Sequence, residues 1–86
     1  AGVRVNAISP GPIADTEGMA RLAPTPEMEE AVKSRLALRD YGTKTDIAET
    51  ALFLSSDNGA YITGTIIDCD GGSKLGDASA DALAGN

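Results

Sequence analysis

The segment NAISPGPIADTEG, residues 6–18, places a proline on each side of a glycine directly after an alternating run of residues. Proline lacks a backbone N–H and fixes φ, so residues 3–9 are predicted to form a β-strand that Pro10 ends. Glycine allows backbone conformations that other residues resist. Hydroxyl and acidic side chains follow this corner at once. The residues alone allow two interpretations, an ordinary strand-ending turn and the wall of a ligand site.

Two helices are predicted before the next strand. The Thr-Pro pair at residues 25–26 has the pattern of an N-cap followed by proline at the first helical position, and it predicts a helix over residues 26–36. The clearer helix spans residues 46–55, where apolar side chains recur at a spacing of three to four positions. Its N-cap is expected at Thr45 or Asp46, because an acidic residue follows Asp46 at capping-box spacing.

A second strand is predicted over residues 65–70, with Asp70 capping the glycine pair that ends it. Strand, helices and strand in this order indicate a β-α-β crossover and therefore a parallel α/β sheet. Both strands carry apolar residues on both sides, as buried parallel strands do, and two strands with two helices are too few to cover such a sheet. Since the chain also begins on the threshold of its first strand, we expect residues 1–72 to be part of a larger domain. Residues 73–86 are expected to form a small, polar, mobile tail.

Charge and composition argue against several classes of function. Seven basic residues against thirteen acidic ones give a net charge of −6, whereas a nucleic-acid partner requires clustered Lys and Arg. The sequence holds no apolar run of the roughly 20 residues that a transmembrane helix needs. A single cysteine and no histidine predict no disulfide and no metal site, and they fit a reducing, intracellular compartment.

Several motifs at matching separations resemble the carboxyl-terminal portion of the short-chain dehydrogenase/reductase family. They are a strand ending in N-A-x-x-P-G, then D-I-A, a helix end F-L-x-S-D, Y-I-T-G, and a last strand closing in D-G-G, over residues 2–72. The resemblance implies the carboxyl-terminal part of a Rossmann-like, doubly wound parallel sheet, incomplete on its own. The segment PGPIADTEGMARL is most similar to the 2,4-dienoyl-CoA reductases of the peroxisomal type, which use NADPH to reduce a conjugated dienoyl thioester.

The resemblance also implies a site. The two prolines deny backbone donors, so the N–H groups of Gly11 and Ile13 are expected to face outward, where one could serve a nicotinamide carboxamide. The Ile13 side chain is expected to pack against the ring. Arg21 is implied on a mobile lid over acyl-CoA, where a guanidinium suits phosphates; its alternative is a solvated helix residue. The residues implied to line the nicotinamide and its adjoining phosphate are Pro10, Gly11, Pro12, Ile13, Ala14, Asp15 and Thr16.

No catalytic residue is assigned to this chain. The family's catalytic pair is a Tyr with a Lys four positions later, but Lys44 follows Tyr41 at the wrong distance, and Thr65 stands four positions after Tyr61. The glycine-rich turn that receives a coenzyme pyrophosphate is also missing. We therefore expect the 86 residues alone to be inactive, with the hydride chemistry depending on residues outside them.

The resemblance further implies partners and a setting. The substrate would be an acyl-CoA thioester, and the last strand with the 46–55 helix would form a homo-oligomer, a tetramer. NADPH is the implied coenzyme with NADH as the alternative, and the compartment stays open between peroxisome, mitochondrion and cytoplasm. Two other functions remain: a short-chain reductase of 3-oxoacyl thioesters or of an alcohol/ketone pair, and a non-catalytic module that binds a partner through an exposed sheet edge.

Overall fold

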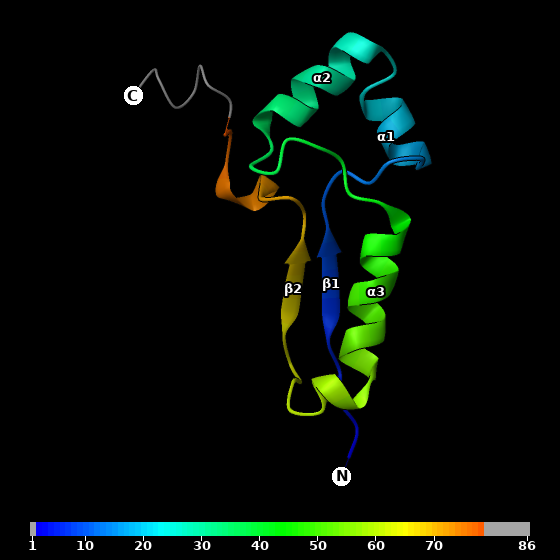
Figure 1. The fold of residues 1–86 in the computed structure, drawn as a ribbon, viewed down its shortest axis with the longest axis vertical. Helices are drawn as coiled ribbons and strands as arrows, with labels where there is room; N and C mark the ends of the chain where they lie inside the picture. Colours follow the sequence, from blue (N-terminus) through cyan, green and yellow to red (C-terminus); the bar gives the residue numbers. More distant parts are fainter. Residues whose placement is uncertain (1, 79–86) are drawn as a thin grey trace.

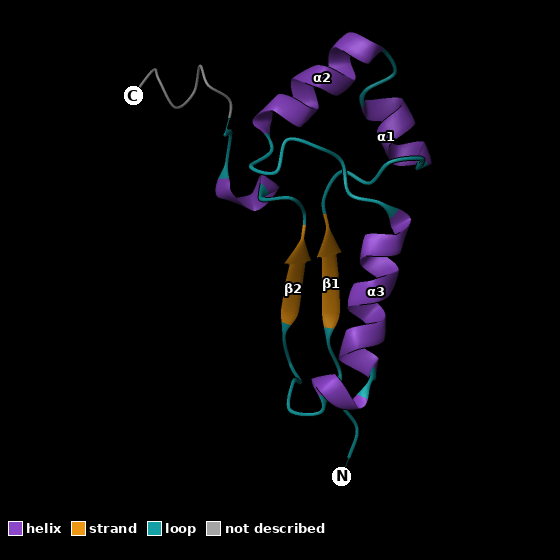
Figure 2. Ribbon diagram, in the orientation of Figure 1, coloured by secondary structure: helices purple, strands orange, loops and turns teal. Residues whose placement is uncertain are grey.

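The computed structural model describes residues 2–78, and the remainder of the expected tail, residues 79–86, lies outside the described residues. Two short strands, three helices and two 3-10 turns make up the fold (Figures 1 and 2). In chain order they are β1 (Ala7–Pro10), α1 (Glu17–Leu22), α2 (Pro26–Arg35), α3 (Lys44–Ser55), the turn Asp57–Gly59, β2 (Ile66–Cys69) and the turn Ser73–Leu75.

The two strands form a parallel pair, with Ala7 opposite Ile66. The predicted parallel crossover is therefore confirmed. Both strands are shorter than predicted, and β1 begins at Ala7 rather than at residue 3. The reason is local, because the chain before β1 bonds irregularly to the loop before β2: the Val5 N–H donates to Thr63 Oγ1, and the Val5 carbonyl accepts from the Gly64 N–H.

Helix α3 packs along β1 and β2 (Figure 1). The opposite face of the sheet is bare within residues 2–78, with Ile66 of β2 69% exposed. The buried apolar residues of the described chain number only four, and this small core is consistent with a sheet that has more neighbours than these residues supply. They are Ile13, Ala23, Leu36 and Leu54.

The helix starts follow capping rules. Helix α2 begins after the predicted N-cap Thr25, whose hydroxyl accepts from the Met28 N–H. The N-cap of α3 is Thr43, so the prediction of Thr45 or Asp46 is wrong by two or three residues. Asp46 instead takes the third helical position: its carboxylate accepts from the Thr43 N–H while its own N–H donates to Thr43 Oγ1. Both assignments use Asp46 in a capping box, and the hydroxyl three residues earlier, at Thr43, is the N-cap.

Helices α1 and α2 lie beyond the carboxyl ends of both strands, whose arrowheads point toward them in Figure 1. In parallel α/β sheets this is the end where ligands bind. No helix within residues 2–78 is both long enough and apolar enough to cross a membrane.

Candidate functional site

The proline-flanked corner begins where β1 ends and is tied to two other segments. The Gly11 N–H donates to the Cys69 carbonyl of β2 at 3.1 Å. The Pro12 carbonyl accepts from the Gly42 N–H at 3.0 Å, and the Ala14 N–H donates to the Gly42 carbonyl at 2.9 Å. The corner is thus a fixed extension of the sheet edge rather than a free loop.

Gly11 permits a close approach between the corner and the end of β2. A Cβ at this position would lie 2.7 Å from both Cα and Cβ of Asp70 and 2.9 Å from the Asp70 carbonyl oxygen. Two of these atoms belong to backbone, which cannot rotate away. Glycine is therefore required here by space, because a side chain would push the corner off β2.

Within residues 2–78, the N–H groups of Ile13, Asp15 and Thr16 in the corner donate to no group. Pro10 and Pro12 have no N–H, and the Gly11 N–H points into the sheet, so the expectation that the Gly11 donor faces outward is wrong. The Ile13 N–H, by contrast, donates to no group within residues 2–78, because the bridge to Gly42 uses the amides of Gly42 and Ala14. Of the three, the Ile13 N–H is the available donor nearest in sequence to the carboxyl end of β1.

The Ile13 side chain faces the protein. It is 9% exposed, and a Cβ on Gly42 would come within 3.0 Å of Ile13 Cδ1. The side chain is part of the small core and also lines a pocket with Tyr41 and Gly42, so its packing against a nicotinamide ring stays a prediction. Its burial fixes the residue whose N–H is available.

Thr16 closes the corner and starts α1. Its hydroxyl donates to the Ile13 carbonyl at 2.8 Å and accepts from the Met19 N–H at 3.3 Å as the helix N-cap. Between them Asp15 is exposed and holds a left-handed conformation with φ +60°. The corner residues expected to line a coenzyme, Pro10 to Thr16, thus form one continuous, hydrogen-bonded unit.

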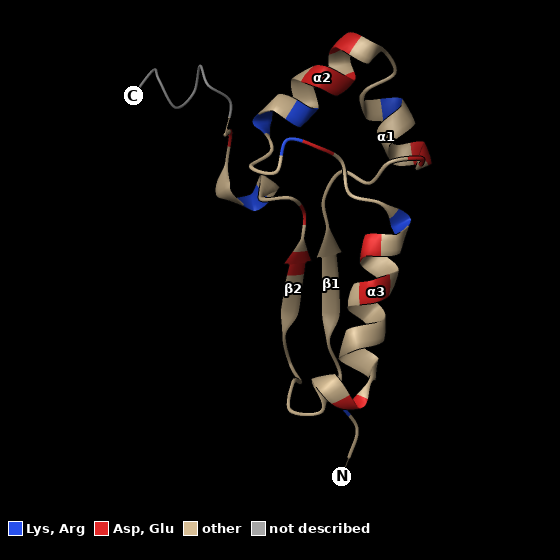
Figure 3. Ribbon diagram, in the orientation of Figure 1, with Lys and Arg blue, Asp and Glu red and all other residues tan. Residues whose placement is uncertain are grey.

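Arg21 lies on α1 at the same end of the sheet. Its side chain is 78% exposed and pairs with Glu17 one turn earlier, as Figure 3 also shows by the colours at the two ends of α1. Exposed pairs of this kind contribute at most about 1 kcal/mol. The guanidinium can therefore exchange this partner for a stronger anion.

Tyr41 lies beside the corner with its ring under Lys33, whose Nζ is 5.2 Å from the ring centroid. Its hydroxyl is buried and has no hydrogen-bond partner within residues 2–78. Loss of solvent around this hydroxyl raises the pKa of Tyr41, with the Glu29 charge adding to the effect. The group is held in its neutral form. Residues 2–78 also contain no cluster of three or more side chains suited to hold a metal ion.

Asp70 caps the turn that follows β2, as predicted. Its carboxylate accepts from the Gly72 N–H at 2.9 Å and from the Lys74 N–H at 3.1 Å. The bond from the Gly72 N–H is the main reason why the pKa of Asp70 lies below its ordinary value. Gly71 and Gly72 both have positive φ, which the tight reversal requires.

The Asp70 turn is expected to weaken in acid. A carboxyl whose pKa is lowered by folding contributes stability above its unfolded pKa, and that contribution disappears as the pH falls through the folded value. The protection of the Gly72 and Lys74 amides against exchange, relative to the intrinsic rate at each pH, should therefore fall below about pH 4. In Asp70→Asn the protection of these two amides should be low at every pH and should not change in acid. An unchanged pH profile in the variant would contradict the assignment.

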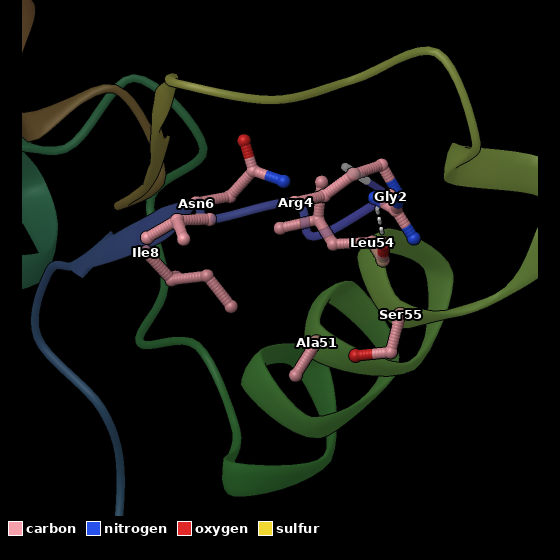
Figure 4. A pocket seen from close by; sticks show the side chains of 8 residues that line it. Gly2, Arg4, Asn6, Ile8, Ala51, Leu54 and Ser55 are labelled. Atoms are coloured by element: carbon pink, nitrogen blue, oxygen red, sulfur yellow. Dashed lines mark hydrogen bonds between the residues drawn. The ribbon is translucent and has the colours of Figure 1, made fainter.

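Arg4 and Asn6 carry structural roles that the sequence reasoning missed. Arg4 Nη1 donates to the Leu54 carbonyl at 2.8 Å (Figure 4) and to the Ile62 carbonyl at 3.1 Å. The Asn6 side-chain amide donates to the same Ile62 carbonyl at 3.0 Å. These bonds join the end of α3 to the loop before β2. The available signal was two polar side chains at alternate positions of an apolar strand. Arg4 and Asn6 line a hollow at the end of β1 that lies away from the corner.

Comparison with known proteins agrees with this geometry. Residues 1–74 match the family model described as enoyl-(acyl carrier protein) reductase. Over 70 residues the chain is 46% identical to the peroxisomal 2,4-dienoyl-CoA reductase of Arabidopsis thaliana, covering 81% of this chain and 23% of that enzyme. The chain therefore spans about a quarter of the length of this relative.

Solved structures show the same fold. A short-chain type dehydrogenase/reductase from Mycobacterium ulcerans superposes with a TM-score of 0.74 at 32% identity, over 94% of this chain and 29% of that one. A 4-hydroxyisoleucine dehydrogenase complexed with NADH gives 0.76 at 35% identity, over 86% of this chain and 30% of that one. Another solved neighbour holds NADP. The chain belongs to the short-chain dehydrogenase/reductase family, and its strands and helices form part of that family's Rossmann-like α/β fold.

Proposed function

We propose that residues 10–16 form the nicotinamide side of a coenzyme site in an NADPH-dependent reductase of 2,4-dienoyl-CoA. The observation that carries the proposal is the free Ile13 N–H at the carboxyl end of β1. The similarity to a reductase of that name and to structures with NADH or NADP supports it. NADH remains the alternative coenzyme, because the neighbours include both.

The residues of the corner fit this coenzyme. A nicotinamide carboxamide has an oxygen that accepts a hydrogen bond, and the Ile13 N–H is available to donate one. The absence of a side chain at Gly11 keeps the corner against β2, while Thr16 holds the Ile13 carbonyl and so fixes the peptide orientation. The nicotinamide supplies the hydride, and the contribution of this chain is orientation. No residue of the chain is assigned to proton transfer.

Arg21 is proposed to bind the phosphates of the acyl-CoA substrate. Its guanidinium is exposed at the coenzyme end of the sheet, and within residues 2–78 it pairs with Glu17 alone. A phosphate can form two parallel hydrogen bonds with a guanidinium and would displace the weaker surface pair.

A homo-oligomer is proposed through α3 and β2. Leu52 and Phe53 of α3 and Ile66 of β2 are exposed apolar residues on these elements. Exposed apolar side chains on these two elements are available for contact with another subunit. We propose a tetramer within peroxisome, mitochondrion or cytoplasm; the named relatives include peroxisomal enzymes.

The proposal is tested with the full-length protein that contains this chain. NADPH and NADH are titrated by isothermal calorimetry, and coenzyme oxidation is then followed with a dienoyl-CoA and with a 3-oxoacyl-CoA of equal length. We expect tight NADPH binding and turnover of the dienoyl-CoA, and no turnover by the 86 residues alone. Turnover of the 3-oxoacyl-CoA only would favour a different short-chain reductase, and failure to bind either coenzyme would refute the site.

A further inference from the structure

The last described segment, Gly76–Ala78, runs back onto the end of α2. We call residues 76–78 the strap. The Ala78 N–H donates to the Arg35 carbonyl at 2.8 Å, and Arg39 Nη2 donates to the Ala78 carbonyl at 3.0 Å. Arg35 Nε and Asp77 Oδ2 add a charge pair at 4.0 Å. Two arginines thus hold the strap by its backbone and its carboxylate. Figure 1 shows it rising beside the last turn of α2.

The strap forms one wall of an apolar groove of about 580 Å³. The opposite wall consists of Leu22 from α1 and Met28, Val32 and Leu36 from α2 and its end. A groove of this volume is within the range of small-molecule sites. Pro12 also lines it, so the groove is continuous with the proposed coenzyme corner. An apolar chain that starts at the coenzyme could therefore enter this groove.

The Gly76 N–H also ties the start of the strap to the Ser73 carbonyl, at 3.2 Å. Ser73, Lys74 and Leu75, which precede the strap, are exposed, and Gly76 has φ +97°. Segments tied by exposed hydrogen bonds, without buried apolar side chains, open at low free energy. The bonds of Arg35 and Arg39 therefore contribute to the position of the strap.

Arg39 is unusual in its own backbone. It holds φ +64°, a left-handed conformation that favours glycine, and its guanidinium also donates to the Ser34 carbonyl at 2.9 Å. A non-glycine residue in this region is uncommon and carries a conformational cost. The Arg39 side chain donates hydrogen bonds to the Ser34 carbonyl in the last turn of α2 and to the Ala78 carbonyl of the strap.

We propose that Arg39 is a positioning residue which, through the strap, determines how long an acyl chain the groove binds. This inference rests on the proposed function. With the strap held, the far methylenes of an acyl chain lie between two walls, and with the strap released they lose one wall to solvent. Short chains end before the strap and are unaffected.

The test is Arg39→Gly in the full-length protein, assayed with six-carbon and ten-carbon 2,4-dienoyl-CoA. Glycine suits φ +64°, so the backbone is not strained by the change. We expect KM for the ten-carbon substrate to rise about fivefold while kcat and the six-carbon KM stay unchanged, because burial of a few methylenes is lost. Exchange of the Ala78 amide should accelerate in parallel. Lys44→Gln, which removes an exposed charge from the start of α3, is the matched control and should change neither quantity.

Each outcome decides between the two proposals. If the unaltered protein turns over neither substrate, the proposed function fails. If it turns over both and Arg39→Gly leaves the ratio of the two KM values unchanged, the role of the strap is refuted while the proposed function stands. Asp77→Asn removes the charge partner of Arg35 at constant side-chain size. Asp77→Asn should raise the ratio of the ten-carbon KM to the six-carbon KM, as Arg39→Gly does. If neither variant changes this ratio, the inference is overturned.

Discussion

Gly11→Ala is expected to remove coenzyme binding and to destabilise the protein together. The new methyl group would lie 2.7 Å from Asp70 Cα, so the corner must move away from β2. Overpacking of this kind costs about 1–3 kcal/mol of unfolding free energy. The displaced corner also misplaces the Ile13 N–H, and small displacements of positioning groups have large effects, so NADPH affinity should fall at least about tenfold. Urea denaturation and calorimetry measure the two effects.

Gly18→Ala is the matched control for this variant. Gly18 lies within α1, and a Cβ there would meet nothing within 4 Å. Alanine is also the better helix former, by about 1 kcal/mol. The control should keep its affinity for NADPH and lose no stability. If Gly11→Ala binds NADPH as well as Gly18→Ala does, the corner does not contact the coenzyme.

Arg4→Leu is expected to be the most destabilising change outside the corner. The variant leaves the carbonyls of Leu54 and Ile62 without the donor that Arg4 Nη1 gives to both. One nitrogen serves both carbonyls, and the Ile62 carbonyl keeps the Asn6 amide as a donor, so the two bonds count as about one. A hydrogen bond to a charged group contributes about 1.5–3 kcal/mol, and the unfolding free energy should fall by that amount. The loop before β2 should also exchange its amides faster. Because the corner lies at the other end of β1, the affinity of the remaining folded protein for NADPH should stay the same.

Two further variants separate charge from packing in this prediction. Arg4→Lys keeps the charge but lacks the planar fork of donors, and it should recover only part of the lost stability. Lys44→Met changes an exposed cation to an apolar residue and should alter the unfolding free energy by less than about 0.5 kcal/mol. Equal stability of Arg4→Leu and Lys44→Met would show that the two carbonyl bonds contribute nothing.

The local rules of the sequence predicted the elements well. Three elements depend only on the backbone of a few neighbouring residues. They are the Pro-Gly-Pro corner, the helix start at Thr25–Pro26 and the glycine pair after β2. Such effects are independent of the rest of the fold. The N-cap of α3 was misplaced because aspartate is favourable both as the N-cap and at the third helical position of a capping box. In the structure Asp46 takes the third position, because the Thr43 hydroxyl accepts its N–H.

Contacts between distant segments were harder to predict. The Gly11 amide was expected to face outward, but its direction depends on β2, which lies nearly sixty residues away in the chain. The shortening of β1 and the role of Arg4 depend on the loop at residues 62–65 in the same way. The motif pattern identified the family and the corner, whereas which amides are free required the three-dimensional arrangement.

The nuclear magnetic resonance signal of the Ile13 amide tests the central proposal most directly. In protein labelled with ¹⁵N at isoleucine, NADPH should shift the Ile13 amide proton downfield and slow its exchange with solvent, as a new hydrogen bond does. Ile47 supplies the internal control, because its amide already donates to the Thr43 carbonyl within α3. An Ile13 signal that stays in place at saturating NADPH would contradict the assignment of this corner to the coenzyme.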